Sequence, residues 1–401
     1  MNVAANQQRT FLRLLEGLQP HWRRDRALPA RIQRSLTGER SFGSRDRRLY
    51  RELIYTTLRH LPWVEPWLGS DPAEAVRRVA WLAADIPATA GFRAAYATGP
   101  APGGDPAELL PGWFRPHCPE AFTPAEAAAL ARRAPLWLRL QTDARGRTSV
   151  ETEFATLGWK WSASPDLPDA LRLEGEVDVT KTAAWQRGRC EVQDVGSQRV
   201  LASVGVEPGG HWLDACAGAG GKTLQLARLL GPAGTVDATD LRPEALAELR
   251  TRLERARAQR VPPGERPAAV NIRPFLPPGE AQYDGVLVDA PCSGSGTWRR
   301  SPHLKWTTTE GDVARAAAVQ GALLRDHAPR VRPGGRLVYA TCSLSSQENE
   351  TVITAFLAAH PQFTAVPFAR ECGGLARGLG LLFLPSRHDS DGFFVASLRR
   401  R

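Results

Sequence analysis

Two cysteines stand where a thiol could act as a nucleophile. Cys292 follows the run Val288-Asp289-Ala290-Pro291 and Cys342 follows Tyr339-Ala340-Thr341, so each comes directly after a short apolar segment typical of a strand. A single cysteine is most often a small buried hydrophobic residue. A pair that follows two strands in the same way favours covalent catalysis by a thiolate.

A glycine-rich loop after another strand predicts a cofactor site. Residues 211–215 lead into Cys216-Ala217-Gly218-Ala219-Gly220-Gly221-Lys222-Thr223 and then into an apolar helix. Small residues let the backbone approach a ligand, and a helix N-terminus offers free N–H groups. The run also fits the end of an ATPase phosphate loop, with 286–289 as the acidic strand, but the first glycine of that motif would fall on Cys216. Asp214, at the end of the strand, suits a cationic methionine group better than a triphosphate.

Asp240 is the candidate partner of a ribose. It ends the next strand of the pattern, 26 residues after Asp214, where a carboxylate can accept hydrogen bonds from both ribose hydroxyls. An aspartate ahead of a helix that starts at Pro243 is also favoured as a helix cap. Both interpretations stay open, and the neighbouring glycine loop favours the ribose.

The elements that must position these residues alternate after residue 190. The expected strands are 211–215, 235–239, 268–272, 285–289 and 336–341, and the expected helices between them include 243–260 and 313–331. This alternation predicts a parallel α/β sheet, whose ligands bind at the carboxyl ends of the strands. The glycine loop, Asp289 and both cysteines should therefore meet at one edge.

The residues before 190 predict two further parts. Apolar residues recur at helical spacing from about residue 6 to 98, as in Phe11, Leu14, Leu15 and Leu18. A stretch rich in Pro and Gly at 98–111 marks a linker, and 123–189 combines a helix signal at 124–133 with strand-like segments. We expect three domains: an all-helical domain at 1–120, a small α+β module at 121–190 and the α/β domain at 191–401.

The charge of the chain indicates a polyanionic partner. The net charge is +10 and the pI about 9.8, and each phosphate that a basic protein contacts releases condensed counterions. Residues 1–60 hold thirteen Arg against five Asp or Glu. Basic helices can equally be solvated faces, so the charge alone leaves nucleic-acid binding as one of two readings.

Composition argues against several other classes of protein. No apolar stretch approaches the roughly 20 residues that span a membrane, and the N-terminus lacks the features of a secretory signal. Six scattered cysteines with no CxxC pair and no histidine cluster predict neither a disulfide framework nor a metal site. We expect a cytoplasmic monomer without membrane or metal partners.

These motifs resemble the NOP/Sun family of RNA cytosine-5 methyltransferases, specifically its RsmB-like bacterial branch. The resemblance covers essentially residues 190–401. The matching stretches are 192–198, 214–223, 289–296 with Arg299, Arg300 and 303–306 behind it, 320–343, Glu348-Asn349-Glu350 and Asp391-Gly392-Phe393-Phe394. Upstream, 44–59 is similar to the NusB-like helical domain of that branch, and 135–140 to the start of its small RNA-binding module.

The resemblance implies a division of labour between the two cysteines. The cysteine of the family's Thr-Cys motif, here Cys342, adds to carbon 6 of cytosine and makes carbon 5 nucleophilic. The cysteine of the Pro-Cys motif, here Cys292, assists release. Asp289 would hydrogen-bond or protonate the ring nitrogen as the adduct forms. Lys222 and Lys305, two of only four lysines, could lower a thiolate pKa, contact phosphate or lie solvated on the surface.

Two positions depart from the family pattern. Gly218-Ala219 replaces Ala-Pro in the glycine loop, so we expect a more flexible loop and an intact site. Family members also place an aspartate after the third strand to contact adenine, whereas this strand runs Asn271-Ile272-Arg273-Pro274. Either Asn271 or a backbone group takes over that contact, or the affinity for the cofactor is reduced.

The resulting prediction is a multidomain enzyme. It has a C-terminal α/β Rossmann-like class I methyltransferase domain, an N-terminal all-helical NusB-like domain and a small α+β RNA-binding module. It would transfer a methyl group from S-adenosylmethionine to carbon 5 of cytosine in RNA, with ribosomal RNA of the small subunit preferred. The expected catalytic residues are Cys342, Cys292 and Asp289, and the expected cofactor residues are Asp214, Cys216, Ala217, Gly218, Ala219, Gly220, Gly221, Lys222, Asp240, Asn271 and Asp289.

Three alternatives remain. A transfer RNA substrate is the nearest, and a non-catalytic RNA-binding ribosome assembly factor is favoured only by the missing aspartate of the third strand. DNA cytosine methylation would take its nucleophile from the Pro-Cys motif and leave Cys342 without a role.

Overall fold

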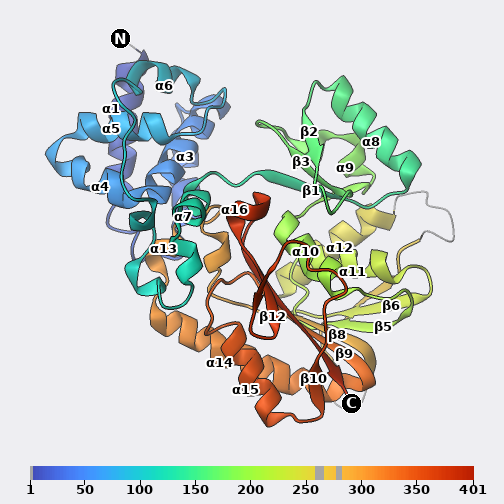
Figure 1. Cartoon of the computed structure of the whole chain (residues 1–401). Helices are drawn as coiled ribbons and strands as arrows, with labels where there is room; N and C mark the ends of the chain where they lie inside the picture. The colour runs from blue at the N-terminus through green and yellow to red at the C-terminus, as the bar shows by residue number, and fades with distance from the viewer. Residues whose placement is uncertain (1–2, 258–265, 277–281) are drawn as a thin grey trace. The chain divides into compact units, whose positions relative to one another are not determined.

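A computed structural model describes residues 3–257, 266–276 and 282–401 (Figure 1). The chain divides into two compact units, one of Met1–Ala134 with Ser295–Glu310 and the other of Pro135–Gly294 with Gly311–Arg401. This division differs from the predicted boundaries at three places. Residues 135–190, predicted within a separate module, share a unit with the α/β domain. Residues 121–134 join the helical unit because α7 (Pro124–Ala131) packs on the short turns η1 (Pro106–Leu109) and η3 (Pro119–Phe122). The segment 295–310, predicted within the α/β domain, also belongs to the helical unit.

The first unit is helical, as the spacing of apolar residues predicts. Its longer helices are α1 (Val3–Leu18), α2 (Leu28–Gly38), α3 (Ser44–Arg59), α4 (Leu61–Ser70), α5 (Pro72–Leu82) and α6 (Ala90–Tyr96), followed by η2 (Gly112–Phe114) and, from the inserted segment, η6 (Ser295–Thr297) and α13 (Leu304–Thr307). Phe11, Leu14, Leu15 and Leu18 are all buried in its core. Among these helices, α5 begins where the Asp71 side chain accepts hydrogen bonds from two backbone N–H groups, a standard N-cap.

The second unit opens with a small antiparallel sheet. Its strands β1 (Leu136–Leu140), β2 (Trp161–Ala163), β3 (Ala170–Leu173) and β4 (Cys190–Val192) are arranged in the order β2-β3-β1-β4. The elements α8 (Ala144–Thr156), η4 (Val179–Lys181) and α9 (Ala183–Gln186) accompany it. The mixture of strands and helices predicted for this region is therefore present from residue 136 onward.

The large sheet carries the elements that matter for the site. Its order is β11-β12-β13-β9-β8-β5-β6-β7, with β10 paired to β13. The strands are β5 (Gly210–Asp214), β6 (Gly234–Ala238), β7 (Ala269–Ile272), β8 (Tyr283–Asp289), β9 (Val331–Thr341), β10 (Phe363–Ala365), β11 (Leu375–Arg377), β12 (Gly380–Phe383) and β13 (Phe393–Arg400). The neighbours from β7 to β9 are parallel, and β13 runs antiparallel to β9. The predicted parallel α/β sheet is confirmed.

Helices connect these strands. They are α10 (Val195–Val204), α11 (Gly221–Leu230), α12 (Pro243–Arg257), α14 (Glu310–His327) with the turn η7 (Ala328–Arg330), α15 (Glu350–Ala359) and α16 (Pro385–His388). The last three residues of the predicted helix 243–260 lie outside the described residues.

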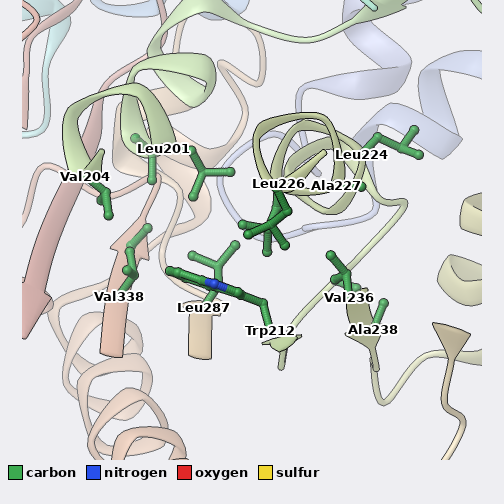
Figure 2. Packing of buried hydrophobic residues seen from close by; sticks show 14 of the residues in the cluster. Leu201, Val204, Trp212, Leu224, Leu226, Ala227, Val236, Ala238, Leu287 and Val338 are labelled. Atoms are coloured by element: carbon green, nitrogen blue, oxygen red, sulfur yellow. The ribbon is translucent and has the colours of Figure 1, made fainter. Parts of the chain in front are cut away.

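A core of apolar side chains fixes the large sheet against α10 and α11. Residues of this cluster labelled in Figure 2 include Leu201, Val204, Trp212, Leu226, Val236, Leu287 and Val338. The indole of Trp212 lies over Gly285 of the adjacent strand, where a Cβ atom would come within 2.4 Å of the ring. The glycine therefore makes room for the largest side chain of this core, and the register of β5 on β8 depends on it.

Candidate active site

Four parallel strands bring the predicted residues to one edge of the large sheet. Asp214 ends β5, Asp289 ends β8 and Cys342 follows β9, while Asp240 lies two residues beyond β6. Because these strands run in the same direction, their carboxyl ends share an edge. The predicted meeting of the glycine loop, the aspartates and the cysteine loops is confirmed by the contacts that follow.

The glycine loop between β5 and α11 is anchored at both ends. The Gly218 N–H donates to Oδ2 of Asp240 at 2.8 Å, and the Ala217 N–H donates to the Thr239 carbonyl at 2.9 Å. Gly220 has a φ of +87°, and a Cβ there would lie 2.2 Å from Leu249. Only glycine satisfies both conditions, so this residue brings the loop backbone close to α12.

An arginine holds the part of the loop that was expected to be flexible. Nη1 of Arg252 donates to the carbonyl of Ala219 at 2.9 Å, and its Nε donates to Glu191 at 2.9 Å. Glu191 is fully buried and also pairs with Arg255 at 2.6 Å. The loop thus gains a polar anchor where family members carry proline.

Asp240 binds both the residues ahead of α12 and the glycine loop. Its Oδ1 accepts from the backbone and side chain of Arg242 ahead of α12, while Oδ2 holds Gly218. Burial alone would raise the pKa of this carboxyl, but the hydrogen bonds from Arg242 and Gly218 outweigh burial and lower it. A charged, partly buried carboxylate therefore stands beside the glycine loop.

Asp214 is a buried carboxyl group, and one of its two oxygens accepts no hydrogen bond from the described residues. Thr223 Oγ1 donates to its Oδ2 at 2.7 Å, whereas Oδ1 is buried without a hydrogen-bond partner in the described part of the chain. Burial raises the pKa of Asp214 to about 7. A buried oxygen of this kind fits a cationic or hydrogen-bonding group of a ligand.

Lys222 forms an ion pair with Asp289. Its Nζ lies 2.9 Å from Oδ2 of Asp289 and 4.8 Å from the centre of the Phe393 ring. The lysine is buried, while the Asp289 side chain keeps 29% of its exposure. The ion pair holds Asp289 in place at the end of β8 with its carboxylate still accessible.

The two cysteines face each other. Cys292 Sγ and Cys342 Sγ are 3.2 Å apart, both are free thiols and both are partly exposed. The hydrogen bond with Cys342, followed by burial, raises the pKa of the Cys292 thiol well above its usual range. By contrast, Cys216 in the glycine loop is a more isolated thiol whose pKa is raised by burial.

A buried glutamate, which the sequence marked only as part of the matching stretch Glu348-Asn349-Glu350 and to which no role was assigned, joins the two cysteine loops. Glu348 accepts hydrogen bonds from Ser293, Ser343 and Gln320. These partners lie 5 to 55 residues from Glu348 along the chain. Neither spacing nor periodicity could have connected them.

Asn271 is placed away from the other predicted cofactor residues. Its side-chain amide donates to Asp237 at 2.9 Å, a carboxylate that also accepts from Tyr283. Its proposed contact with adenine is not supported by any contact that we observe and stays a prediction. Two exposed apolar residues lie nearer the edge: Leu241 and Phe275, at 97% and 87% exposure, each follow the paired ends of β6 and β7 by three residues.

Lys305 has neither of its predicted functional roles nor a surface position. It belongs to the helical unit, where its buried Nζ donates to the carbonyls of Arg59 at 2.8 Å and Leu109 at 3.2 Å. The prediction that it contacts phosphate or activates a thiolate is wrong, because these two backbone groups occupy the ammonium. Within the described ranges, no cluster of three or more His, Cys, Asp or Glu side chains could hold a metal ion.

Comparison with known proteins finds relatives that are named as ribosomal RNA methyltransferases. A sequence profile described as "16S rRNA methyltransferase RsmB/F" matches residues 202–399. The protein named Ribosomal RNA small subunit methyltransferase B from Erwinia tasmaniensis is 34% identical over 302 residues, covering 74% of this chain and 67% of the relative. The protein of the same name from Salmonella arizonae is 34% identical over 298 residues, covering 73% and 67%.

Solved structures agree at the level of the fold. The structure described as a methyltransferase homolog protein from Pyrococcus horikoshii is 25% identical, covers 72% of this chain and 93% of its own, and has a TM-score of 0.59. The structure of NSun6 from Pyrococcus horikoshii with SFG has a TM-score of 0.61 at 19% identity, covering 74% and 98%. None of the helices in the described ranges is long and apolar enough to cross a membrane. The chain therefore belongs to the RsmB/F family of RNA methyltransferases, in the RsmB-like branch of the NOP/Sun group.

Proposed function

We propose that this RNA methyltransferase transfers a methyl group from S-adenosylmethionine to carbon 5 of a cytosine, through a covalent adduct with Cys342. The observation that carries the proposal is the pair of free thiols 3.2 Å apart, at the same sheet edge as the Asp289 carboxylate. A thiolate that adds to carbon 6 makes carbon 5 nucleophilic, and a second thiol beside it can move protons during release. Two facing thiols suit this chemistry better than a single nucleophile would.

The residues at the edge fit S-adenosylmethionine. Asp240 would accept hydrogen bonds from the ribose hydroxyls, the backbone of Gly218 to Gly221 would line the cofactor, and the unpartnered Oδ1 of Asp214 would face its cationic methionine part. Leu241 and Phe275 offer apolar surface for adenine in place of the missing aspartate. When bound, the cofactor supplies an electrophilic methyl group.

The chain's own residues would handle the base. Cys342 loses its proton to solvent and its thiolate adds to carbon 6, while the ring nitrogen takes up a proton from solvent as the adduct forms. The Asp289 carboxylate, held by Lys222, accepts a hydrogen bond from that protonated nitrogen and stabilises the adduct. After methylation, carbon 5 gives up its proton to solvent, the bond from carbon 6 to Cys342 Sγ breaks with the electron pair leaving on sulfur, and the ring nitrogen returns its proton. Cys292 assists this release from its position beside Cys342.

Small-subunit ribosomal RNA is the substrate that we propose. The relatives carry that substrate in their names, and the chain has a net charge of +10. We assign the basic helical unit, as a NusB-like domain, and the small antiparallel sheet to RNA contacts, with the protein acting as a cytoplasmic monomer. A transfer RNA remains the nearest alternative substrate.

The assay that tests the proposal uses S-adenosylmethionine carrying an isotopically labelled methyl group. Transcripts of bacterial small-subunit ribosomal RNA and of transfer RNA are incubated separately with the protein, digested to nucleosides and analysed by mass spectrometry. We expect labelled 5-methylcytidine from the ribosomal transcript. Label only in the transfer RNA would change the substrate, and label in any other nucleoside would contradict the cysteine chemistry. If neither free transcript is labelled but assembling ribosomal particles are, the particle is the substrate.

A further inference from the structure

Glu348 contacts both loops that carry the cysteines. Its Oε1 accepts from the Ser293 N–H at 2.8 Å, and its Oε2 accepts from the hydroxyls of Ser293 and of Ser343, the latter at 2.6 Å. Ser293 directly follows Cys292, and Ser343 directly follows Cys342. One carboxylate therefore links the residue after one thiol to the residue after the other.

Gln320 connects Glu348 to the Cys292 loop a second time. Gln320 of α14 donates from Nε2 both to Oε1 of Glu348 and to the carbonyl of Pro291, each at 3.0 Å. The Cys292 loop is thus held by the residues on either side of the cysteine. Glu348 and Gln320 are both fully buried, so water does not compete for these hydrogen bonds.

The Cys342 side is fixed by independent contacts. Asn349 donates from Nδ2 to the Ser343 carbonyl at 2.9 Å and accepts from Thr341 Oγ1 at 2.7 Å, and Tyr339 donates to the Glu348 carbonyl. These bonds fasten the turn that carries Glu348 to the end of β9. The glutamate side chain then reaches across to the loop after β8.

We propose that Glu348 is a positioning residue that holds Cys292 and Cys342 opposite each other by binding the residue after each of them. The proposal rests on the proposed function for its catalytic meaning, since it assigns to Glu348 the alignment of the attacking and the releasing thiol. Without the carboxylate, the Cys292 loop would still have the hydrogen bond from Gln320 to the Pro291 carbonyl and the direct contact between the Ser293 and Ser343 hydroxyls at 3.3 Å, but it would lose the acceptor that binds both serines at once. The separation of 3.2 Å between the sulfur atoms depends on this carboxylate.

The charge of Glu348 has a second consequence. The pKa of Cys292 is raised first by its hydrogen bond to Cys342 and by burial, and the negative charge of Glu348 adds to the rise. The carboxylate thus favours the thiol form of Cys292. A thiol at this position suits a residue that handles protons during release.

Two variants separate position from charge. Glu348→Gln keeps one acceptor oxygen for the Ser293 N–H and Gln320, and its amide can donate to the two serine hydroxyls, so the link survives without the charge. Glu348→Ala removes both. Glu350→Gln is the matched control. Glu350, the first residue of α15, is a neighbouring carboxylate that pairs with Arg377 at 2.7 Å and does not take part in the link.

The first measurement is the rate at which diamide cross-links the two thiols, in the full chain without cofactor or RNA. Diamide takes two electrons and two protons from Cys292 and Cys342 and is reduced to a hydrazine, leaving one disulfide that peptide mass mapping identifies. We expect Glu350→Gln to react like wild type and Glu348→Gln to react at least as fast, because it keeps the link and loses the charge that disfavours the Cys292 thiolate. Glu348→Ala should react at least about tenfold more slowly, because the thiols lose their alignment. Cross-linking of Glu348→Ala at the wild-type rate would overturn the proposal.

The second measurement decides the matter if Glu348→Ala does not fold. Alkylation of Cys292 by iodoacetamide is followed against pH, and the thiolate is the reacting form. Glu348→Gln should alkylate severalfold faster at a given pH than wild type and Glu350→Gln, and an unchanged profile would count against Glu348. Since neither readout involves methylation, a wild-type protein that fails to form 5-methylcytidine would refute the proposed function while leaving the positioning role to be judged on these results.

Discussion

At the scale of single residues, Asp240 fixes the glycine loop to the residues ahead of α12. Its two carboxylate oxygens are already shared between Gly218 and Arg242, so the loop and the start of α12 are aligned before a ligand arrives. The competing interpretations of this aspartate, helix cap and ribose partner, are compatible in the structure. A ribose would be bound by a carboxylate that is fixed in place beforehand.

Replacing the Asp240 carboxylate should weaken the binding of S-adenosylmethionine without creating a site for ATP. We expect Asp240→Ala to reduce S-adenosylmethionine binding by about 1–3 kcal/mol, the range for a lost charge-assisted hydrogen bond. Calorimetry measures both ligands, and the wild-type protein should show no tight ATP binding. Glu244→Ala, an exposed carboxylate in the first turn of α12, is the control. Equal loss in both variants, or tight ATP binding, would contradict the cofactor assignment.

Residues that follow strands could be predicted, whereas residues that act across the chain could not. Asp289 and both cysteines are visible from the sequence because each is adjacent to an apolar strand. Glu348 belongs to a stretch that resembles the family, but its contacts could not be predicted, because they arise from the pairing of β8 with β9, which brings Ser293 and Ser343 together. Lys305 was misread for a related reason, since only tertiary packing shows that backbone carbonyls receive its ammonium.

At the scale of elements, the parallel strands were predictable from their apolar runs, but several ends were not. The sequence predicts a strand at 336–341, after the run Pro333-Gly334-Gly335. The strand starts at Val331 instead, with a register shift against β8 and a φ of +78° at Gly334, so the glycines form an irregularity within the strand. The strands β11 and β12 are too short to leave a periodic pattern.

The anchoring of the glycine loop by α12 can be tested directly. Arg252→Gln should lower the affinity for S-adenosylmethionine by about 1 kcal/mol, since the Ala219 carbonyl loses a charged donor. It should also lower the Tm, because buried Glu191 loses one of the two arginines with which it forms ion pairs in the described part of the chain. Arg250→Gln, at an exposed position of the same helix, should change neither value. Unchanged binding in Arg252→Gln would show that the loop needs no such anchor.

At the scale of the whole molecule, the helical unit is completed by a segment from within the catalytic part of the sequence. The chain enters this unit at Ser295, three residues after Cys292, and leaves it after Glu310. There Trp298 packs edge-on against Phe114 at 4.7 Å, and Trp306 donates to the Leu58 carbonyl at 2.7 Å. Removal of residues 1–134 would uncover these side chains, so the helical unit is not a simple appendage.

The buried lysine of this segment makes stability depend on pH. Burial, and then the neighbouring Arg59, lower the pKa of Lys305 from 10.5 to about 7. Between these two pH values the unfolded chain binds a proton that the folded chain does not. The buried lysine therefore destabilises the fold fully below pH 7, and this destabilisation falls as pH rises from 7 to 10.5.

Lys305→Met removes the titration. We expect the free energy of unfolding of the variant, taken relative to that of wild type, to be about 1–3 kcal/mol higher at pH 6 than at pH 9.5. The reason is that only wild type carries the buried charge at low pH. Denaturant unfolding at the two pH values measures this difference. Lys181→Met, at a lysine side chain with 83% exposure, is the control and should show no pH-dependent change. A difference for Lys305→Met that does not vary with pH would mean that the ammonium is not titrating as its burial requires.

The central claim of the account is that Cys342 attacks the base and Cys292 assists release. The most direct measurement incubates each cysteine variant with substrate RNA and S-adenosylmethionine and then separates the products on a denaturing gel. We expect Cys342→Ala to be inactive and to form no covalent complex, because no thiolate reaches carbon 6. Cys292→Ala should attack and methylate but resolve poorly, so a shifted, denaturant-resistant protein–RNA band should accumulate. A covalent band in Cys342→Ala with none in Cys292→Ala would make Cys292 the nucleophile, and full activity of both variants would refute a covalent role for either cysteine.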